Sequence, residues 1–254
     1  MQFVVTPATG KRMIAKGIAR HHAVQSALQT GTVVVVAGTT NGYVAEELLA
    51  LIGEPDGFDR QGFFRGITLP PSYKTTEKGR LPDRSRFPGD VIITQGKWQR
   101  RRTIVDVIDD LKEGDVILKG ANALDLQKRQ AAVLISDPKG GTSVVALQAV
   151  VGRRVRLILP VGLEKRVSVE LNDIAHLLNA PGFQGPRFLP VPGEVVTEIE
   201  ALAILTGVHA ELIAGGGVCG AEGAVWLAVS GSGEQVKKAR EFIESIADEP
   251  LFAL

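Results

Sequence analysis

The sequence predicts an α/β protein with a mostly parallel, Rossmann-like three-layer sheet over residues 1–182. A small ferredoxin-like α+β domain is expected over residues 183–254. Two observations lead to this prediction. Apolar runs without polar alternation recur between amphipathic segments, which indicates strands buried on both faces and joined by helices. After the Pro and Gly pairs at 181–186, the order changes to a strand, a helix, a hairpin and a last helix.

The first part of the chain supplies the alternating elements. Alanines at every fourth position predict a helix over 13–29 that lies close against a neighbouring element. The valines at 33–36 predict a buried strand, and a helix follows the segment AGTTNG and ends near Ile52. By the same patterns we expect strands at 91–94, 115–120, 131–136 and 155–160, and helices at 103–111, 142–151 and 168–179.

The second part predicts a βαββα unit. A strand is expected at 188–191 and a helix at 194–206. The runs VHAELIA and AVWLAVS, joined by GGGVCGAEG, predict a hairpin, and a last helix is expected at 234–247. Ser232 with Gln235 three residues later is typical of a capping box at the start of that helix.

Composition excludes several classes of protein. With 44% hydrophobic and 22% charged residues among 254, the chain resembles an ordinary globular protein rather than a disordered or fibrous one. No apolar run is long enough for a membrane span, and the first residues do not resemble a secretory signal, so a cytoplasmic protein is expected. Cys219 is the only cysteine, and His21 and His22 show no metal-ligand spacing, so we expect neither a metal nor another cofactor.

Two glycine- and threonine-rich turns are candidates for anion binding. Each follows an apolar strand and precedes a helix, whose first amide groups can bind a phosphate or a carboxylate. Because ligands of parallel sheets bind beyond the carboxyl ends of the strands, the two turns are expected at one edge. The alternative is a plain tight connection. The residues concerned are Gly38, Thr39, Thr40, Asn41 and Gly42 in the first turn, and Lys139, Gly140, Gly141 and Thr142 in the second.

Several short segments resemble the NagB/RpiA/CoA-transferase-like superfamily. The strand, Gly-Thr turn and helix around AGTTNG resemble the opening of ribose-5-phosphate isomerases, and LKGANALD at 118–125 is similar to a later segment of that family. PKGGTSVVALQAV and VRLILPVGLEK resemble sugar-regulator sensor domains and translation-initiation regulatory subunits, and FLPVPGEVVTEIEAL resembles the entry to the isomerases' small domain. The resemblance implies a phosphate-contacting turn at 38–41.

The chain departs from the isomerase pattern at two positions. Lys119 and Asn122 stand where that pattern has acidic residues, so aldose–ketose isomerisation by the family mechanism is not expected. Lys119 could hold a substrate anion or be a solvated strand-end lysine. Glu164, next to Lys165, is a candidate general base, with a surface ion pair as the alternative. Asp125 is a further candidate carboxylate.

The basic residues are concentrated in one stretch. Residues 60–102 hold 11 Lys and Arg against 3 Asp and Glu, whereas the whole chain has a net charge of +1. Within this stretch KWQRRR, which includes Arg100, could bind a small anion or single-stranded nucleic acid, or face an oligomer interface. The proline-rich segment 69–90 shows no periodicity and is interpreted as a lid, a partner-binding arm or a loop.

Together these features predict an enzyme that acts on a small anionic metabolite such as a sugar phosphate or an acyl-CoA. The reaction type stays open, because no pair of a base and a nucleophile stands out. The alternatives are a non-catalytic sensor or regulatory subunit on the same scaffold and an RNA-binding protein. We also expect a homo-oligomer. GGGVCGAEG is interpreted as a hairpin connection, with Cys219 as a nucleophile in the alternative.

Overall fold

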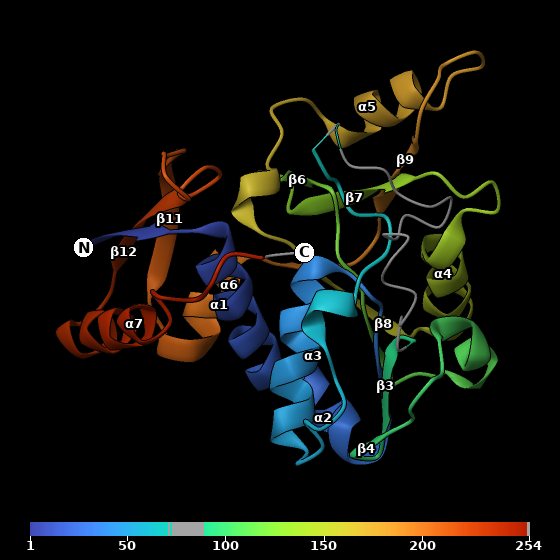
Figure 1. The fold of residues 1–254 in the computed structure, drawn as a ribbon, viewed down its shortest axis with the longest axis horizontal. Coiled ribbons are helices and arrows are strands. Elements are labelled where there is room, and N and C mark those ends of the chain that lie inside the picture. The colour runs from blue at the N-terminus through green and yellow to red at the C-terminus, as the bar shows by residue number, and fades with distance from the viewer. Residues whose placement is uncertain (71, 73–88, 253–254) are drawn as a thin grey trace.

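A six-stranded, largely parallel sheet lies at the centre of the protein (Figure 1). The computed structural model describes residues 1–70, 72 and 89–252, so most of the segment 69–90 lies outside the described residues. The strand order is β10-β8-β5-β2-β3-β4. Its strands are β2 (Thr32–Val35), β3 (Val91–Thr94), β4 (Lys97–Trp98), β5 (Val116–Leu118), β8 (Arg156–Pro160) and β10 (Glu194–Val196).

Four neighbouring strands of this sheet run parallel. They are β10, β8, β5 and β2, whereas β3 and β4 are antiparallel to their neighbours. Alternate residues of β2 belong to different cores: Val33 and Val35 pack on one face, and Val34 on the other. The lack of polar alternation therefore correctly predicted a strand that is covered on both faces.

Helices cover one face of this sheet. They are α1 (Pro7–Arg20), α2 (His22–Thr30) and α3 (Thr39–Leu51). The expected single helix over 13–29 is wrong in detail, because His21 adopts an extended conformation and separates α1 from α2. The opposite face is covered by α4 (Gly141–Arg153) and by two short 3-10 turns, η2 (Ile104–Asp106) and η3 (Ile108–Asp110).

The α-helix expected at 103–111 is wrong, because the structure has two 3-10 turns there. Asp106 accepts hydrogen bonds from the amide and the hydroxyl of Thr103, so the first turn closes on itself at once. β-branched residues and aspartates also have weak intrinsic helix propensity. The apolar spacing of Ile104 and Ile108 predicted their burial but not the type of turn.

Two smaller antiparallel sheets flank the central one. One has the order β6-β7-β9, and the other the order β1-β12-β11. Their strands are β6 (Ala123–Asp125), β7 (Gln130–Ile135), β9 (Arg187–Val191), β1 (Gln2–Val5), β11 (His209–Gly215) and β12 (Val225–Ser230). The run at 131–136 therefore lies outside the parallel sheet, which corrects the expectation for that strand.

Strand pairing crosses the expected boundary at residue 182. β9 pairs with β7 and β10 pairs with β8, both of which come from the first part of the chain. β1 in turn pairs with β12 near the other end of the chain. The helices of this part are α5 (Leu171–Leu178), α6 (Glu198–Thr206) and α7 (Gly233–Ser245). The helix expected at 194–206 begins only at Glu198, because β10 occupies residues 194–196.

Close helix packing joins the central and C-terminal parts. A Cβ atom added to Gly17 of α1 would lie 2.7 Å from the Cβ of Ala201 in α6, so glycine lets the two helices touch. The capping box expected at Ser232 and Gln235 is present at the start of α7. No helix among the described residues is long and apolar enough to cross a membrane.

Candidate functional site

The carboxyl ends of the four parallel strands meet at one edge of the central sheet. Gly38 follows β2, Lys119 follows β5, Gly162 follows β8, and Glu198 follows β10. Ligands of open parallel sheets bind beyond this edge. Two groups of ionisable side chains gather there, one around Lys119 and one around Glu198.

The amino terminus of α3 lies open at this edge. Gly38 is its N-cap and provides no side-chain hydrogen bond, and a Cβ built on Gly38 would meet no described atom within 4 Å. The same is true of Gly120 after β5. The hydroxyl of Thr40 is buried and has no hydrogen-bond partner within the described part of the chain. Open space, unpaired amides and an unpaired hydroxyl therefore lie at the ends of two adjacent strands.

Two residues of the AGTTNG turn have structural roles instead. The Asn41 side-chain amide donates to the carbonyls of Val36 at 2.7 Å and Leu118 at 2.9 Å, so it joins the ends of β2 and β5. A Cβ on Gly42 would lie 2.8 Å from Cγ of Arg60, whose side chain occupies that space. Of the turn, Gly38 and Thr39 stay partly exposed, whereas Thr40 is buried.

Lys119 is half-buried at the end of β5. Burial and, to a lesser degree, the nearby Arg65 guanidinium lower the pKa of its amine to about 8, although Asp90 acts in the opposite direction. The amine makes no hydrogen bond within the residues that the structure describes. A buried cation without a bonded counter-charge is costly, which is why this amine releases its proton easily.

Asp90 holds the neighbourhood of Lys119 together. Its carboxylate is 1% exposed and accepts hydrogen bonds from the amides of Ala37 at 2.9 Å and Ile104 at 2.8 Å. It also pairs with Arg65. The charge of Asp90 is therefore already bonded by three donors, and Lys119 has no ion pair with it. Sequence reasoning missed Asp90, because it ends a segment without periodicity.

Glu198 is the most strongly perturbed acid of the second group. Its side chain, at the first position of α6, is 2% exposed, and one carboxyl oxygen accepts from the Leu163 amide at 2.9 Å. Burial and, to a lesser degree, the Glu164 carboxylate raise the pKa of Glu198 to about 8. Glu198 is consequently protonated at neutral pH, next to a second carboxyl group.

Lys11 of α1 faces the same two carboxyl groups. Burial lowers the pKa of the Lys11 amine, whereas Glu164 and Glu198 act to raise it. Glu164 is half-buried in the 3-10 turn η4 (Leu163–Lys165) that follows β8. Two carboxyl groups with different environments beside an amine are a common arrangement for donating and accepting protons. The sequence predicted Glu164, but it missed Lys11 and Glu198.

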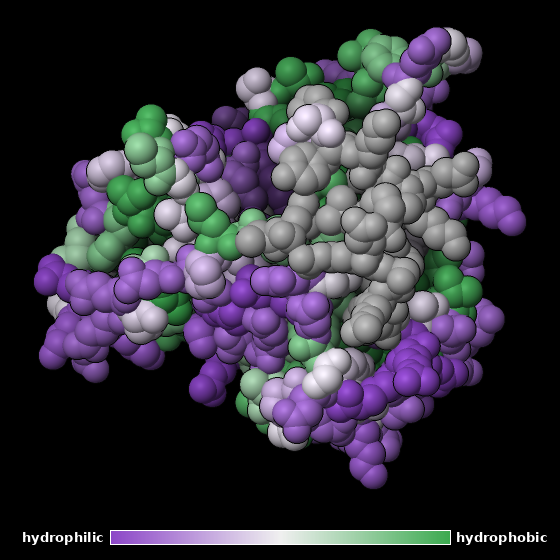
Figure 2. Space-filling model, viewed as in Figure 1, coloured by the Kyte–Doolittle hydropathy of each residue, from purple (hydrophilic) through white to green (hydrophobic). Residues whose placement is uncertain are grey.

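A charged network borders this second group. Arg12 pairs with Glu46 at 2.7 Å, with Glu47 at 2.8 Å and with Glu249 at 2.8 Å, so the C-terminal segment is held against α1 and α3. The Arg60 guanidinium lies 3.9 Å from the centre of the buried Tyr43 ring. Hydrophilic side chains accordingly gather over α3 in Figure 2.

The glycine-rich hairpin between β11 and β12 reaches Glu164. A Cβ on Gly223 would lie 3.3 Å from Cγ of Pro7 and 3.9 Å from Cβ of Glu164. Cys219 is exposed on this hairpin, with a φ of 55°. His209 pairs with Glu211 at 3.1 Å at the opposite end of β11, so it does not activate the thiol.

The expectation that both glycine-rich turns share one edge is wrong. The turn with Lys139, Gly140, Gly141 and Thr142 follows β7, which belongs to the separate β6-β7-β9 sheet. Lys139 is exposed, and its amide donates to Asp137 at 2.7 Å. The error arose because an apolar run does not reveal which strand it pairs with.

Two further predicted residues have local roles. The Arg100 guanidinium lies 4.0 Å from the centre of the Trp98 ring and donates to the Asp56 carbonyl at 2.9 Å, so contacts on its own surface engage it. The Asp125 carboxylate accepts from the Lys128 amide at 2.9 Å in the turn between β6 and β7. Neither residue joins the groups around Lys119 and Glu198.

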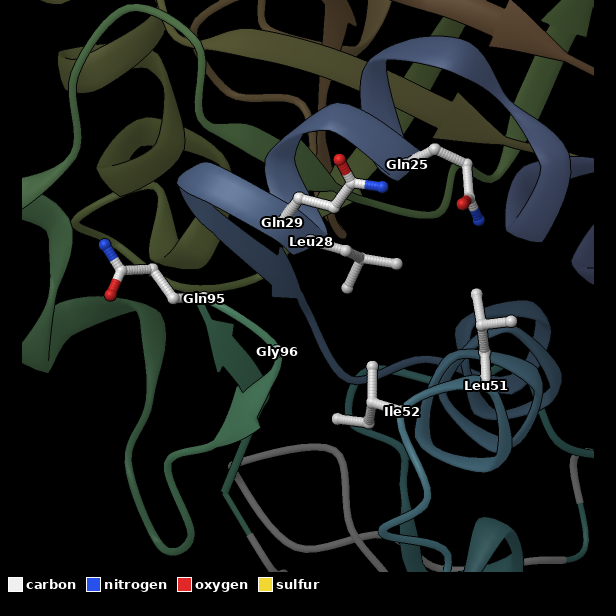
Figure 3. A pocket seen from close by; sticks show the side chains of 7 residues that line it. All are labelled: Gln25, Leu28, Gln29, Leu51, Ile52, Gln95 and Gly96. Atoms are coloured by element: carbon white, nitrogen blue, oxygen red, sulfur yellow. The ribbon is translucent and has the colours of Figure 1, made fainter.

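A hollow of about 440 Å³ lies at the opposite edge of the sheet (Figure 3). Gln25 and Gln29 of α2, Leu51 and Ile52 at the end of α3, and the turn between β3 and β4 line it. None of the described residues that line it is ionisable, so its chemistry differs from that of the strand ends. Among the described residues no cluster of His, Cys, Asp or Glu is suited to hold a metal ion.

Comparison of the chain with family models, with curated proteins and with solved structures found no match. Its chemistry is therefore inferred from the residues at the strand ends.

Proposed function

We propose that the protein is an enzyme that binds a small anionic metabolite at the carboxyl ends of β2, β5, β8 and β10 and transfers protons on it. The observation that carries this proposal is the open amino terminus of α3 beside Lys119, on the same edge as the carboxyl pair of Glu164 and Glu198. Binding groups and proton-transfer groups thus share one edge.

The α3 terminus and Lys119 would bind the anion. Free amides at a helix start favour a phosphate or a carboxylate, and the open space at Gly38 and Gly120 leaves room for it. Lys119 adds a positive charge that no described carboxylate neutralises directly.

Glu198 and Glu164 would handle protons. Glu198 carries a proton at neutral pH and can donate it, and the Glu164 carboxylate can accept one. Strand β8 lies between β5 and β10, so at least two strand spacings, about 10 Å, separate Lys119 from Glu198. A metabolite the size of a sugar phosphate spans that distance, and an acyl-CoA could place its acyl end there.

The resemblance to the NagB/RpiA/CoA-transferase-like superfamily supports the same proposal. We infer that the central sheet is the Rossmann-like part of that fold. The β1-β12-β11 sheet with α6 and α7 would correspond to its ferredoxin-like part, with β1 supplied by the other end of the chain. A homo-oligomer, as expected from sequence, belongs to this proposal as well.

A thermal-shift screen over inorganic phosphate, sugar phosphates, nucleotides and coenzyme A derivatives tests the binding step. We expect at least one compound to raise the melting temperature of the wild type, and the shift to vanish in Lys119→Met. Loss of one charge-assisted contact weakens binding roughly 10- to 100-fold. Lys139→Met is the matched control, because this exposed lysine lies on the separate sheet.

The screen has clear contrary outcomes. If no compound stabilises the protein, or if Lys119→Met responds as the wild type does, the anion site is refuted.

Turnover of the bound compound then separates an enzyme from a sensor. We expect Glu198→Gln to abolish turnover while it keeps the thermal shift, because the amide retains the shape of the side chain and cannot donate an acidic proton. Binding without turnover in the wild type would favour the non-catalytic sensor, in line with Lys119 standing where the isomerases have an acid.

A further inference from the structure

Lys119 combines features that are unusual for a lysine near a strand end. Its amine has no hydrogen-bond partner among the described residues, and the carboxylate nearest to it, Asp90, is already bonded by Arg65 and two backbone amides. A lysine that only balanced charge would be expected to pair with that carboxylate. Instead Arg65 takes the carboxylate and places a second positive charge beside Lys119.

Two glycines near Lys119 leave space that no described atom occupies. Gly120 follows Lys119 directly, and a Cβ there would meet no described atom within 4 Å. Gly38 on the adjacent strand end faces similar space, and Lys119 is only half-buried. A nucleophile needs room for the approaching carbon atom, and these two glycines provide it.

We propose that Lys119 is the nucleophile that forms an imine with the carbonyl carbon of an aldehyde or ketone bound at this edge. The proposal rests on the proposed function, because it names the substrate class as a carbonyl compound with an anionic group. The amine nitrogen adds to the carbonyl carbon and gives a carbinolamine, which loses water to form the imine. Water hydrolyses the imine again at the end of the cycle, so no oxidant or reductant is required.

The neighbouring charges favour the reactive form of this amine. Burial and Arg65 lower the pKa of Lys119 to about 8. At about pH 7.5, roughly one quarter of such amines are unprotonated, against roughly one in a thousand for a lysine with an ordinary pKa. Among the described residues, Asp90 is the acidic group that acts against this shift, and its charge is bonded elsewhere.

Pyridoxal 5′-phosphate is a suitable probe, because it carries an aldehyde and a phosphate. The full chain is incubated with it at about pH 7.5, borohydride reduces any imine to a stable amine, and peptide mapping locates the label. We expect Lys119 to be labelled at least roughly tenfold faster than the exposed Lys139 and Lys237. Equal labelling of Lys119 and these exposed lysines would overturn the inference.

Arg65→Gln tests the role of the neighbouring charge. The amide can still donate to Asp90, so the fold is retained, but the positive charge beside Lys119 is removed. We expect the pH midpoint of Lys119 labelling to rise towards that of an ordinary lysine, with slower labelling at neutral pH. An unchanged midpoint would contradict a reactive amine tuned by Arg65. Circular dichroism and the melting temperature verify that the variant is folded.

Two controls separate this inference from the anion site. Pyridoxal without the phosphate reports the amine alone, and inorganic phosphate as a competitor reports the anion site. Fast labelling of Lys119 by both aldehydes without protection by phosphate would support the imine and refute the anion site. A metabolite could stabilise the protein in the thermal-shift screen while Lys119 is labelled no faster than Lys139. That result would refute the imine and leave the proposed function standing.

Discussion

Replacement of Glu198 by glutamine should change how the stability of the protein depends on pH. The folded protein holds a proton on Glu198 up to about pH 8, whereas the ordinary pKa of this carboxyl group is 4.5. Between these values the folded state binds one more proton than the unfolded state, so the free energy of unfolding falls as pH rises. The contribution of Glu198 to stability is fully present below pH 4.5 and is lost by about pH 8.

The size of this effect follows from the shift. Within this window the free energy of unfolding falls by about 1.4 kcal/mol per pH unit. The titration of Glu198 therefore lowers the stability of the wild type by about 3 kcal/mol between about pH 5 and about pH 7.5. Glutamine has the shape of the protonated acid, and its amide oxygen can accept the hydrogen bond from Leu163. Since glutamine does not titrate, the stability of wild type relative to Glu198→Gln should fall by about 3 kcal/mol over this range.

Urea unfolding followed by tryptophan fluorescence measures this difference at several pH values. Asp106→Asn is the control. Hydrogen bonds from the hydroxyl and the amide of Thr103 lower the pKa of Asp106, so this carboxylate is ionised across the range in both states and the stability difference should stay flat. If the difference in free energy of unfolding between wild type and Glu198→Gln changed by less than about 0.5 kcal/mol across the pH range, Glu198 would not be a buried protonated acid.

Three other substitutions, with Gly152→Ala as a control for the first, probe the packing that positions the site. Gly17→Ala should destabilise by about 1–3 kcal/mol, because its Cβ would force α1 away from α6, whereas Gly152→Ala, with open space around it, should be neutral or slightly stabilising. Asp90→Asn should cost about 3 kcal/mol, because a guanidinium loses its carboxylate and one backbone amide loses its acceptor. Glu249→Gln should cost about 1–3 kcal/mol, because Arg12 loses a mostly buried charge partner.

Urea unfolding measures each of these changes, and amide hydrogen exchange adds a local measurement for Glu249→Gln. Exchange in residues 246–252 should accelerate in that variant, since the C-terminal segment loses its contact with α1. Equal stability of the two alanine variants would contradict the close approach of α1 and α6. An unchanged exchange rate would show that the C-terminal segment is held by other contacts.

The sequence predicted the local features of the fold well. The apolar run at 33–36 identified a doubly covered strand, because burial on both faces removes polar alternation at that place in the chain. It did not reveal partners, which depend on residues far away. The runs at 131–136 and 188–191 were read as elements of different domains, although β7 and β9 pair with each other.

The candidate site shows the same limit. Lys119 was singled out because it stands where the isomerase pattern has an acidic residue, and Glu164 because it lies shortly after an apolar strand. Glu198 was missed because TEIE reads as an ordinary helix start, where an acidic residue is common. Recognising the short run at 194–196 as a strand would have placed Glu198 at a strand end. Lys11 gave no signal, because its burial arises from packing against a distant part of the chain.

The pairing of β1 with β12 has a consequence for how the chain acquires its structure. Phe3 and Val5 face Leu227 and Val225, so the first strand finds its partner only after almost all intervening residues exist. Closing such a long loop costs entropy before any contact is made, which slows this step. During synthesis on the ribosome the opening segment must therefore wait with its apolar side chains uncovered, and the β1-β12-β11 sheet would assemble last.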